Sequence, residues 1–177
     1  MQYRLGQALT RIEDLVRSDD LTGVANRRGI MEALRWHHAQ AVRDSQPLGV
    51  ALLDVDHFKR INDDFGHDSG DRVLRTLGTL LREQARATDC VGRYGGEEFL
   101  LVLPCTTAVQ AGEVMERLRT RVESTAWETV FEGAAGVTVS IGTTVCQPGE
   151  SVEAAVRRAD EALYEGKAAG RNRVVVA

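Results

Sequence analysis

Acidic residues gather in one stretch of the chain, directly after an apolar run. Six of the 12 aspartates fall within 18 residues; they are Asp54, Asp56, Asp63, Asp64, Asp68 and Asp71. Such a cluster is often only a solvated loop. Here Asp54 and Asp56 end a run typical of a buried strand, where carboxylates two apart lie on the same side. Carboxylates on a rigid sheet suit Mg²⁺ when phosphates complete its ligands, so a metal site and a solvated turn both stay open.

A second acidic pair follows two glycines. Gly95-Gly96 separates two strand-like runs, which predicts a hairpin with a type I′ turn and φ > 0 at both glycines. The hairpin would bring Glu97 and Glu98 into the same sheet as Asp54. Because successive strand residues point to opposite faces, we expect at most one of the two glutamates beside Asp54.

Lysine is nearly absent from the chain. Of 22 basic residues only Lys59 and Lys167 are lysine, and the other 20 are arginine. A general preference for arginine explains the bias but not the two exceptions. An isolated lysine is usually surface charge, whereas here the pair predicts positions that need a compact ammonium group.

Composition limits the class of protein. A chain of 177 residues with 43% hydrophobic and 27% charged residues is typical of one globular domain. It has no apolar run near the roughly 20 residues that span a bilayer and no secretory signal, so we expect no direct membrane contact. The net charge of −4 disfavours a nucleic-acid partner. Three cysteines without a CxxC pair favour a reducing, cytoplasmic location.

Periodicity and turn residues predict the elements that position these side chains. Helices are expected over 27–43, 58–65, 69–86, 108–124 and from 152 onward, and strands over 48–55, 90–94, 97–103, 136–146 and 174–176. Asn26 and Ser151 are expected to cap their helices. The order β-α-α-β-β-α-β-α-β implies an α/β (α+β) fold with a mixed central sheet of about five strands flanked by helices.

The first 18 residues are predicted to form a separate unit. Leu5, Leu9, Ile12 and Val16 follow a heptad-like spacing, which predicts a short amphipathic helix. We therefore divide the chain into an N-terminal stalk helix, 1–18, and a domain, 19–177. Because so short a helix is marginal alone, we expect it to continue a longer stalk or to pair with a partner helix.

Four sequence blocks together resemble the GGDEF family, the diguanylate cyclases. They are RYGGEEF at 93–99, D-x-LTG-x-x-NRR at 19–28, D-x-D-x-FK-x-IND-x-x-GH-x-x-GD at 54–71 and AD-x-ALY-x-x-K-x-x-GRN at 159–172. The blocks occur in family order, with Val24 and Gly166 as small departures. The resemblance implies a nucleotidyl-cyclase, palm-like fold that condenses two GTP into cyclic di-GMP and two pyrophosphates.

The resemblance also implies roles for individual residues. Mg²⁺ or Mn²⁺ would be held by Asp54, Glu97 and the Val55 carbonyl, and catalysis would use Asp54, Glu97, Glu98 and Lys59. The triphosphate would be bound by His57, Phe58, Lys59, Lys167 and Arg171. Guanine would be recognised by Asn62 and Asp71. An Asp carboxylate accepts hydrogen bonds from guanine edges that adenine lacks, so GTP is expected in preference to ATP.

A second nucleotide site is implied upstream of the signature. Arg86 and Asp89 match the family's RxxD product-inhibition motif, and Arg117 matches a further arginine of that site. An Arg and an Asp three apart are also a common local ion pair. Because the product contains two GMP units and one domain holds one GTP, the resemblance implies a homodimer, with an upstream sensory domain in the full-length protein.

Two other functions compete with catalysis. A GGDEF domain without turnover could serve as a receptor for GTP or cyclic di-GMP, although such domains typically lose signature acids that this chain keeps. A polymerase-like palm would use similar metal-binding acids, but this acidic chain has no basic groove for nucleic acid.

Overall fold

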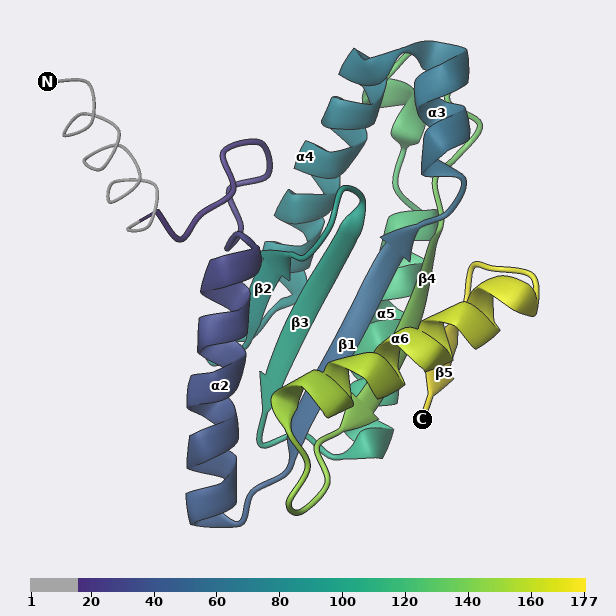
Figure 1. The fold of residues 1–177 in the computed structure, drawn as a ribbon. Helices are drawn as coiled ribbons and strands as arrows, with labels where there is room; N and C mark the ends of the chain where they lie inside the picture. Colours follow the sequence, from purple (N-terminus) through teal and green to yellow (C-terminus); the bar gives the residue numbers. More distant parts are fainter. Residues whose placement is uncertain (1–15) are drawn as a thin grey trace, which may run out of the picture.

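The computed structural model describes residues 16–177 (Figure 1). The elements are α2 (Arg27–Asp44), β1 (Leu48–Val55), α3 (Phe58–Phe65), α4 (His67–Gln84), β2 (Cys90–Arg93), β3 (Glu98–Pro104), α5 (Ala108–Glu123), a 3₁₀ turn (Trp127–Thr129), β4 (Val139–Val145), α6 (Val152–Ala168) and β5 (Val174–Val176). This order agrees with the expected one, and the 3₁₀ turn is an addition to it.

One five-stranded sheet runs through the domain in the order β2-β3-β1-β4-β5. The strand β1 lies between β3 and β4 and is antiparallel to both, while β5 pairs with β4 in parallel. Every residue of β1 is buried. The predicted mixed sheet with an apolar central strand is therefore confirmed.

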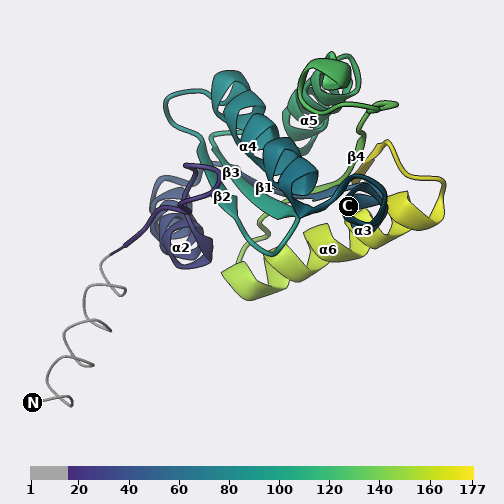
Figure 2. The same cartoon turned by 90° about the horizontal axis from the view of Figure 1, so that it is seen from above.

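Helices cover both faces of the sheet (Figure 2). On one face α4 and α5 pack against alternate residues of β1 such as Leu53 and Val55. On the other face α2 and α6 pack against the residues between them, such as Leu52. Because side chains alternate along a strand, Asp54 lies on the same face as Leu52, the face that α6 covers.

Local capping residues set the helix starts. The Asn26 side chain accepts a hydrogen bond from Gly29 N–H at the start of α2, and Ser151 accepts one from Ala154 N–H at the start of α6. Both expected caps are confirmed. The helix α4 begins at His67, two residues earlier than expected, after Gly66 at φ 85°.

The predicted stalk helix falls mainly on residues 1–15, outside the described part of the chain. Residues 16–18 are not helical, because the Asn26 backbone and side chain donate hydrogen bonds to the carbonyls of Arg17 and Val16 and hold them extended. Between residues 16 and 177 no helix is both long and apolar enough to cross a bilayer.

Candidate active site

Asp54 lies near the end of β1 and is paired with a lysine from α6. Its side chain is 10% exposed, and Lys167 Nζ lies 3.1 Å from Asp54 Oδ2. Burial raises the pKa of the Asp54 carboxyl, and the hydrogen bond from Lys167 opposes that shift. Asp56 raises the same pKa and Arg171 lowers it, so both act on Asp54 electrostatically. The last turn of α6 and the end of β1 therefore form one charged site.

Glu98 is the direct cross-strand neighbour of Asp54. The antiparallel register of β1 and β3 places the two residues opposite each other, and opposed residues project from the same face. Burial raises the pKa of the Glu98 carboxyl, and repulsion by Asp54 raises it further. This pairing joins the end of β1 to the start of β3.

Glu97 lies just before β3, so strand alternation does not direct its side chain away from Asp54. The Val55 N–H donates a hydrogen bond to the Glu97 carbonyl at 3.3 Å. Burial raises the pKa of the Glu97 carboxyl, with further contributions from Asp54 and Glu98. The register places Glu98 directly opposite Asp54, as expected for one of the two glutamates, while Glu97 lies outside the strand and interacts with Asp54 electrostatically.

The donor set of this site fits a divalent cation with phosphate ligands. Asp54, Glu97 and Glu98 repel one another, and Lys167 supplies one positive charge among them. Among the described residues no three His, Cys, Asp or Glu side chains are placed to enclose a metal ion. Asp54 and Glu97 could hold Mg²⁺ or Mn²⁺ with phosphate oxygens, since these ions prefer oxygen ligands. A cation there would oppose the burial and the mutual repulsion that together raise the pKa values of these carboxyls.

The turn at Gly95-Gly96 differs in geometry from the one expected. Neither Gly95 nor Gly96 has positive φ, so the predicted type I′ turn is wrong. The N–H groups of Tyr94 and Gly95 both donate to the Glu98 carbonyl, which makes a wider turn. A Cβ atom on Gly95 would lie 2.3 Å from Glu98 Oε2. Gly95 therefore leaves space for the Glu98 carboxylate, and its backbone conformation does not itself need glycine.

The hydrogen bonds and the ion pair that support this turn were not predicted from the sequence. Arg93 Nη2 donates to the Gly96 carbonyl at 2.7 Å, and Arg93 Nη1 lies 3.2 Å from Asp19 Oδ1. Asp19 in turn accepts hydrogen bonds from the Thr22 amide at 2.9 Å and hydroxyl at 2.6 Å. The segment before α2 thus holds the signature turn in place. Asp19 and Arg93 both lie in the sequence blocks that resemble the GGDEF family. This was the signal in the sequence from which their supporting role could have been inferred.

The passage from β1 to α3 contains several predicted phosphate-binding residues. His57 is exposed and has a left-handed backbone, with φ 54°. Phe58 is half-buried, and Lys59 is exposed in the first turn of α3. No side chain in the described range pairs with Lys59. The structure thus leaves this ammonium accessible next to the Asp54 end of β1.

Asn62 and Asp71 lie where α3 meets α4. Asn62 Oδ1 is buried, and no described residue donates a hydrogen bond to it. A Cβ atom on Gly70 would lie 1.9 Å from that oxygen, so Gly70 provides the space for the amide. Asp71 is the next residue of α4 and is half-buried. An unpaired buried acceptor is unfavourable, so this site is suited to a ligand that donates N–H groups.

The residues of the predicted inhibitory site are only partly assembled. Arg86 Nη2 lies 2.8 Å from Asp89 Oδ1 and donates to the Thr106 hydroxyl at 2.7 Å. The Asp89 side chain is 2% exposed, whereas that of Arg86 is 51% exposed. Arg117 on α5 lines a cavity of about 740 Å³ together with Gln84 of α4. In the part of the chain that the structure describes, no hydrogen bond or ion pair links Arg117 to Arg86 or Asp89.

Sequence comparison identifies the family of the chain. A family model described as "Diguanylate cyclase, GGDEF domain" matches residues 16–173. The chain belongs to the GGDEF family. The GGDEF chain is 44% identical over 161 residues, 90% of its length, to diguanylate cyclase DgcP of Pseudomonas aeruginosa. It is 42% identical over 165 residues, 92% of its length, to response regulator PleD of Caulobacter vibrioides.

Structure comparison gives the same family. The coiled coil and GGDEF domain of DgcB from Caulobacter crescentus, solved in complex with c-di-GMP, superposes with a TM-score of 0.87 at 34% identity. The superposition covers 99% of this chain and 93% of that one. The match to DgcP spans 24% of that protein, and the match to PleD spans 36% of it. This chain therefore corresponds to about a quarter to a third of those relatives.

Proposed function

We propose that this domain is a diguanylate cyclase that condenses two GTP molecules into cyclic di-GMP and two pyrophosphates. The observation that carries the proposal is the meeting of Asp54, Glu97 and Glu98 at one end of the sheet, with Lys167 beside them. The 3′-oxygen of each GTP forms a bond to the α-phosphorus of the other. The bond from that phosphorus to pyrophosphate breaks, and each 3′-hydroxyl loses its proton.

The side chains around the carboxylates take the roles that this reaction requires. Lys59, Lys167 and Arg171 bind the triphosphate, because these three cations lie at the Asp54 end of the sheet. Asn62 and Asp71 accept hydrogen bonds from the guanine N–H groups. Adenine does not offer those donors, so the buried Asn62 oxygen would stay unpaired with ATP.

A divalent cation fits the same site. Asp54 and Glu97 are its proposed side-chain ligands and the Val55 carbonyl a backbone ligand. When bound, Mg²⁺ or Mn²⁺ would acidify the attacking hydroxyl and stabilise the charge on the leaving pyrophosphate. Lys167 Nζ lies 3.1 Å from one carboxylate oxygen of Asp54, a proposed metal ligand. We therefore propose that Lys167 turns from Asp54 to the triphosphate when substrate and metal enter.

Two copies of the domain are needed for one turnover. Each copy holds one GTP, so the two sites must face each other in a homodimer. The amphipathic pattern of residues 1–18 is the proposed dimerising segment, and the DgcB structure in the comparison includes a coiled coil. An upstream sensory domain that controls this pairing is part of the proposal, as is a cytoplasmic location.

The first experiment incubates the concentrated protein, stripped of bound nucleotide, with GTP and Mg²⁺. Nucleotide products are separated by chromatography, and Glu97→Gln is the matched variant because it keeps the side-chain shape and removes the charge. We expect cyclic di-GMP from the parent protein and none from Glu97→Gln. Specific activity should rise with protein concentration, as expected of a dimeric enzyme.

The same experiment separates the cyclase from the receptor function. A receptor would bind GTP or cyclic di-GMP in a calorimeter and make no product at any protein concentration. Fusion of a strong parallel coiled coil ahead of Leu5 then distinguishes a true receptor from a chain that lacks a dimerising partner. Product after fusion supports the cyclase, and continued inactivity supports the receptor.

Product inhibition through Arg86, Asp89 and Arg117 is a further part of the proposal. Arg86 is half-exposed, and its guanidinium can recognise a guanine edge or a phosphate. The partly exposed guanidinium and the nearby α4–α5 cavity support a ligand site here. Arg86→Ala should raise the cyclic di-GMP concentration required for half-inhibition, and an unchanged inhibition curve would refute this part.

A further inference from the structure

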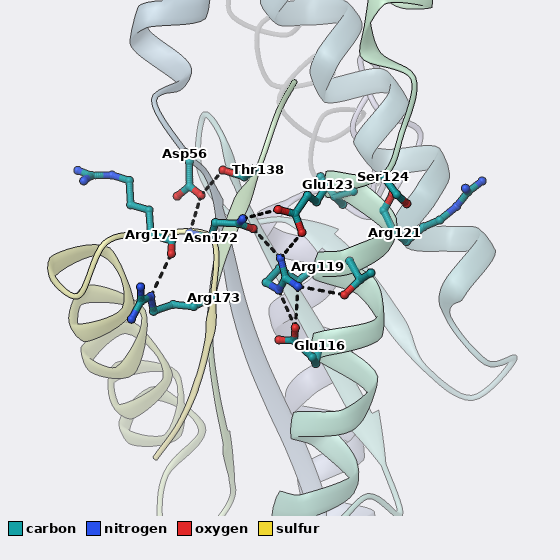
Figure 3. Close-up of polar contacts among 12 residues, drawn as sticks. Asp56, Glu116, Arg119, Arg121, Glu123, Ser124, Thr138, Arg171, Asn172 and Arg173 are labelled. Carbon is teal, nitrogen blue, oxygen red and sulfur yellow. Dashed lines mark hydrogen bonds and ion pairs between the residues drawn. The ribbon is translucent and has the colours of Figure 1, made fainter. Parts of the chain in front are cut away.

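The second acid of the Asp54-x-Asp56 pair is fully engaged by the protein itself. Asp56 is 5% exposed and accepts three hydrogen bonds, of which Figure 3 shows those from Thr138 and Asn172. Ser140 Oγ lies 2.6 Å from Asp56 Oδ1, Thr138 Oγ1 lies 2.7 Å from Oδ2, and Asn172 N lies 3.0 Å from Oδ2. Asp56 therefore ties β4 and the segment after α6 to the end of β1.

The Asn172 side chain is held from the opposite direction by α5. Arg119 Nη1 donates to Asn172 Oδ1 at 2.8 Å, and Asn172 Nδ2 donates to Glu123 Oε1 at 2.8 Å (Figure 3). Arg119 is itself fixed by ion pairs of 2.7 Å to Glu116 and Glu123. Both the backbone and the side chain of Asn172 are thus anchored.

These anchors hold an unusual backbone conformation. Arg171 has φ 64° and Asn172 has φ 47°, both in the left-handed region. Asparagine tolerates this region, but arginine rarely adopts it, and it persists only where the surrounding structure enforces it. The Arg171 N–H donates to the Gly166 carbonyl at 3.0 Å, and the Arg171 carbonyl accepts from Arg173 Nε at 3.0 Å. The Arg171 side chain itself is exposed and points away from this network (Figure 3).

We propose that Asp56 is a positioning residue for Arg171. Through the Asn172 N–H, it holds the left-handed pair 171–172 and thereby aims the Arg171 guanidinium at the nucleotide triphosphate. This inference rests on the proposed function, in which Arg171 binds GTP. It assigns to Asp56 a role in GTP binding without contact with substrate or metal.

A conservative replacement of Asp56 distinguishes a role in positioning Arg171 from a role as a metal ligand. Asp56→Asn with its oxygen at the Oδ2 position keeps an acceptor for the Asn172 N–H and the Thr138 hydroxyl, and its amide N–H can donate to the rotatable Ser140 hydroxyl. Asp56→Ala loses all three hydrogen bonds. Positioning predicts that Asp56→Asn retains most GTP affinity, whereas a metal ligand would lose much of it with Asn too, because the charge that attracts the cation is removed.

A double-mutant cycle with Arg171→Ala tests whether Asp56 acts through Arg171. The probe is α,β-methylene-GTP, which cannot be cleaved at that bond, and binding is measured by calorimetry. Asp56→Ala should weaken binding about tenfold in the parent and have little further effect in Arg171→Ala, a coupling of about 1.4 kcal/mol. Equal losses in both backgrounds, or Asp56→Asn as weak as Asp56→Ala, would overturn the proposal.

Two further variants keep the test decisive if Asp56→Ala does not fold. Asn172→Gly keeps the left-handed backbone accessible, whereas Asn172→Ala disfavours it. Asn172→Ala should weaken probe binding more than Asn172→Gly, and the opposite order would contradict the proposal. Thr143→Val removes a buried hydrogen bond of 3.1 Å to the Val50 carbonyl elsewhere in the sheet and controls for general destabilisation.

The proposed function can fail separately from this inference. If the parent protein neither binds the probe nor makes cyclic di-GMP from GTP, the cyclase proposal fails. The inference about Asp56 then fails as well, because it rests on that proposal. If the parent is active and the cycle shows no coupling, only the role of Asp56 is wrong.

Discussion

Lys167 Nζ and Asp54 Oδ2 lie 3.1 Å apart, in a pair whose carboxylate is largely buried and whose ammonium is about one-third exposed. Lys167→Met would leave the Asp54 charge without its partner inside the protein. We expect the free energy of unfolding at neutral pH to fall by about 1–3 kcal/mol. Urea denaturation of the parent and the variant measures this change.

The partner variant for that experiment is the double substitution Asp54→Asn with Lys167→Met. It leaves no buried charge to compensate, so it should be more stable than Lys167→Met alone. If the double variant is the less stable of the two, the ion pair does not account for the loss.

Gly95 and Gly96 offer a matched pair of substitutions. A Cβ atom on Gly95 would lie 2.3 Å from Glu98 Oε2, whereas at Gly96 no described atom lies within 4 Å. Gly95→Ala should displace the flexible Glu98 carboxylate and thereby reduce turnover about tenfold or more. The free energy of unfolding should fall by less than about 1 kcal/mol, because the displaced group is the end of a flexible side chain. Gly96→Ala should be close to the parent in stability, because neither space nor φ opposes it.

Steady-state cyclase assays and thermal unfolding of both variants test this prediction. A Gly95→Ala protein with parental turnover would show that the position of the Glu98 carboxylate does not matter for the reaction.

Asn62 is expected to reduce the stability of the ligand-free domain. Its Oδ1 is buried without a donor from the described residues. Asn62→Leu should therefore raise the free energy of unfolding by about 1 kcal/mol and weaken GTP binding at the same time. Chemical denaturation and calorimetry with a GTP analogue provide the two readouts. A less stable variant would mean that water or a different side-chain rotamer satisfies the amide.

Asp19 should make stability depend on pH. Burial raises the pKa of its carboxyl, but hydrogen bonds from Thr22 and the charge of Arg93 together lower it below the ordinary value. A carboxyl with a lowered folded-state pKa stabilises the protein above its unfolded-state pKa, and this contribution is lost as pH falls through the folded-state value. Asp19→Asn should therefore cost about 1 kcal/mol near pH 7 and progressively less toward about pH 3.

Denaturation of the parent and Asp19→Asn across that range gives the difference directly. A difference that is constant with pH would show that the charge of Asp19 contributes nothing, and that only its shape or neutral hydrogen bonds matter.

Local sequence patterns predicted most of the secondary structure because they act over a few residues. The apolar run of β1, the Asn26 and Ser151 caps, and the hairpin after Cys90 all follow from neighbouring residue types. The turn at Gly95-Gly96 was assigned the wrong geometry. Two adjacent glycines permit positive φ but do not require it, and here the space needed by Glu98 explains one of them.

The sequence by itself determined the family, the order of the elements and the set of acidic, lysine and proposed guanine-recognising side chains. Tertiary structure decided their partners: Glu98 faces Asp54 through strand register, Lys167 reaches Asp54 from α6, and Asp56 accepts a hydrogen bond from the Asn172 N–H. Spacing along the chain could not distinguish Asp54 from Asp56, because both have the same parity on one strand. Which carboxylate stays available for chemistry depends on the donors that distant segments bring to it when the sheet and helices pack.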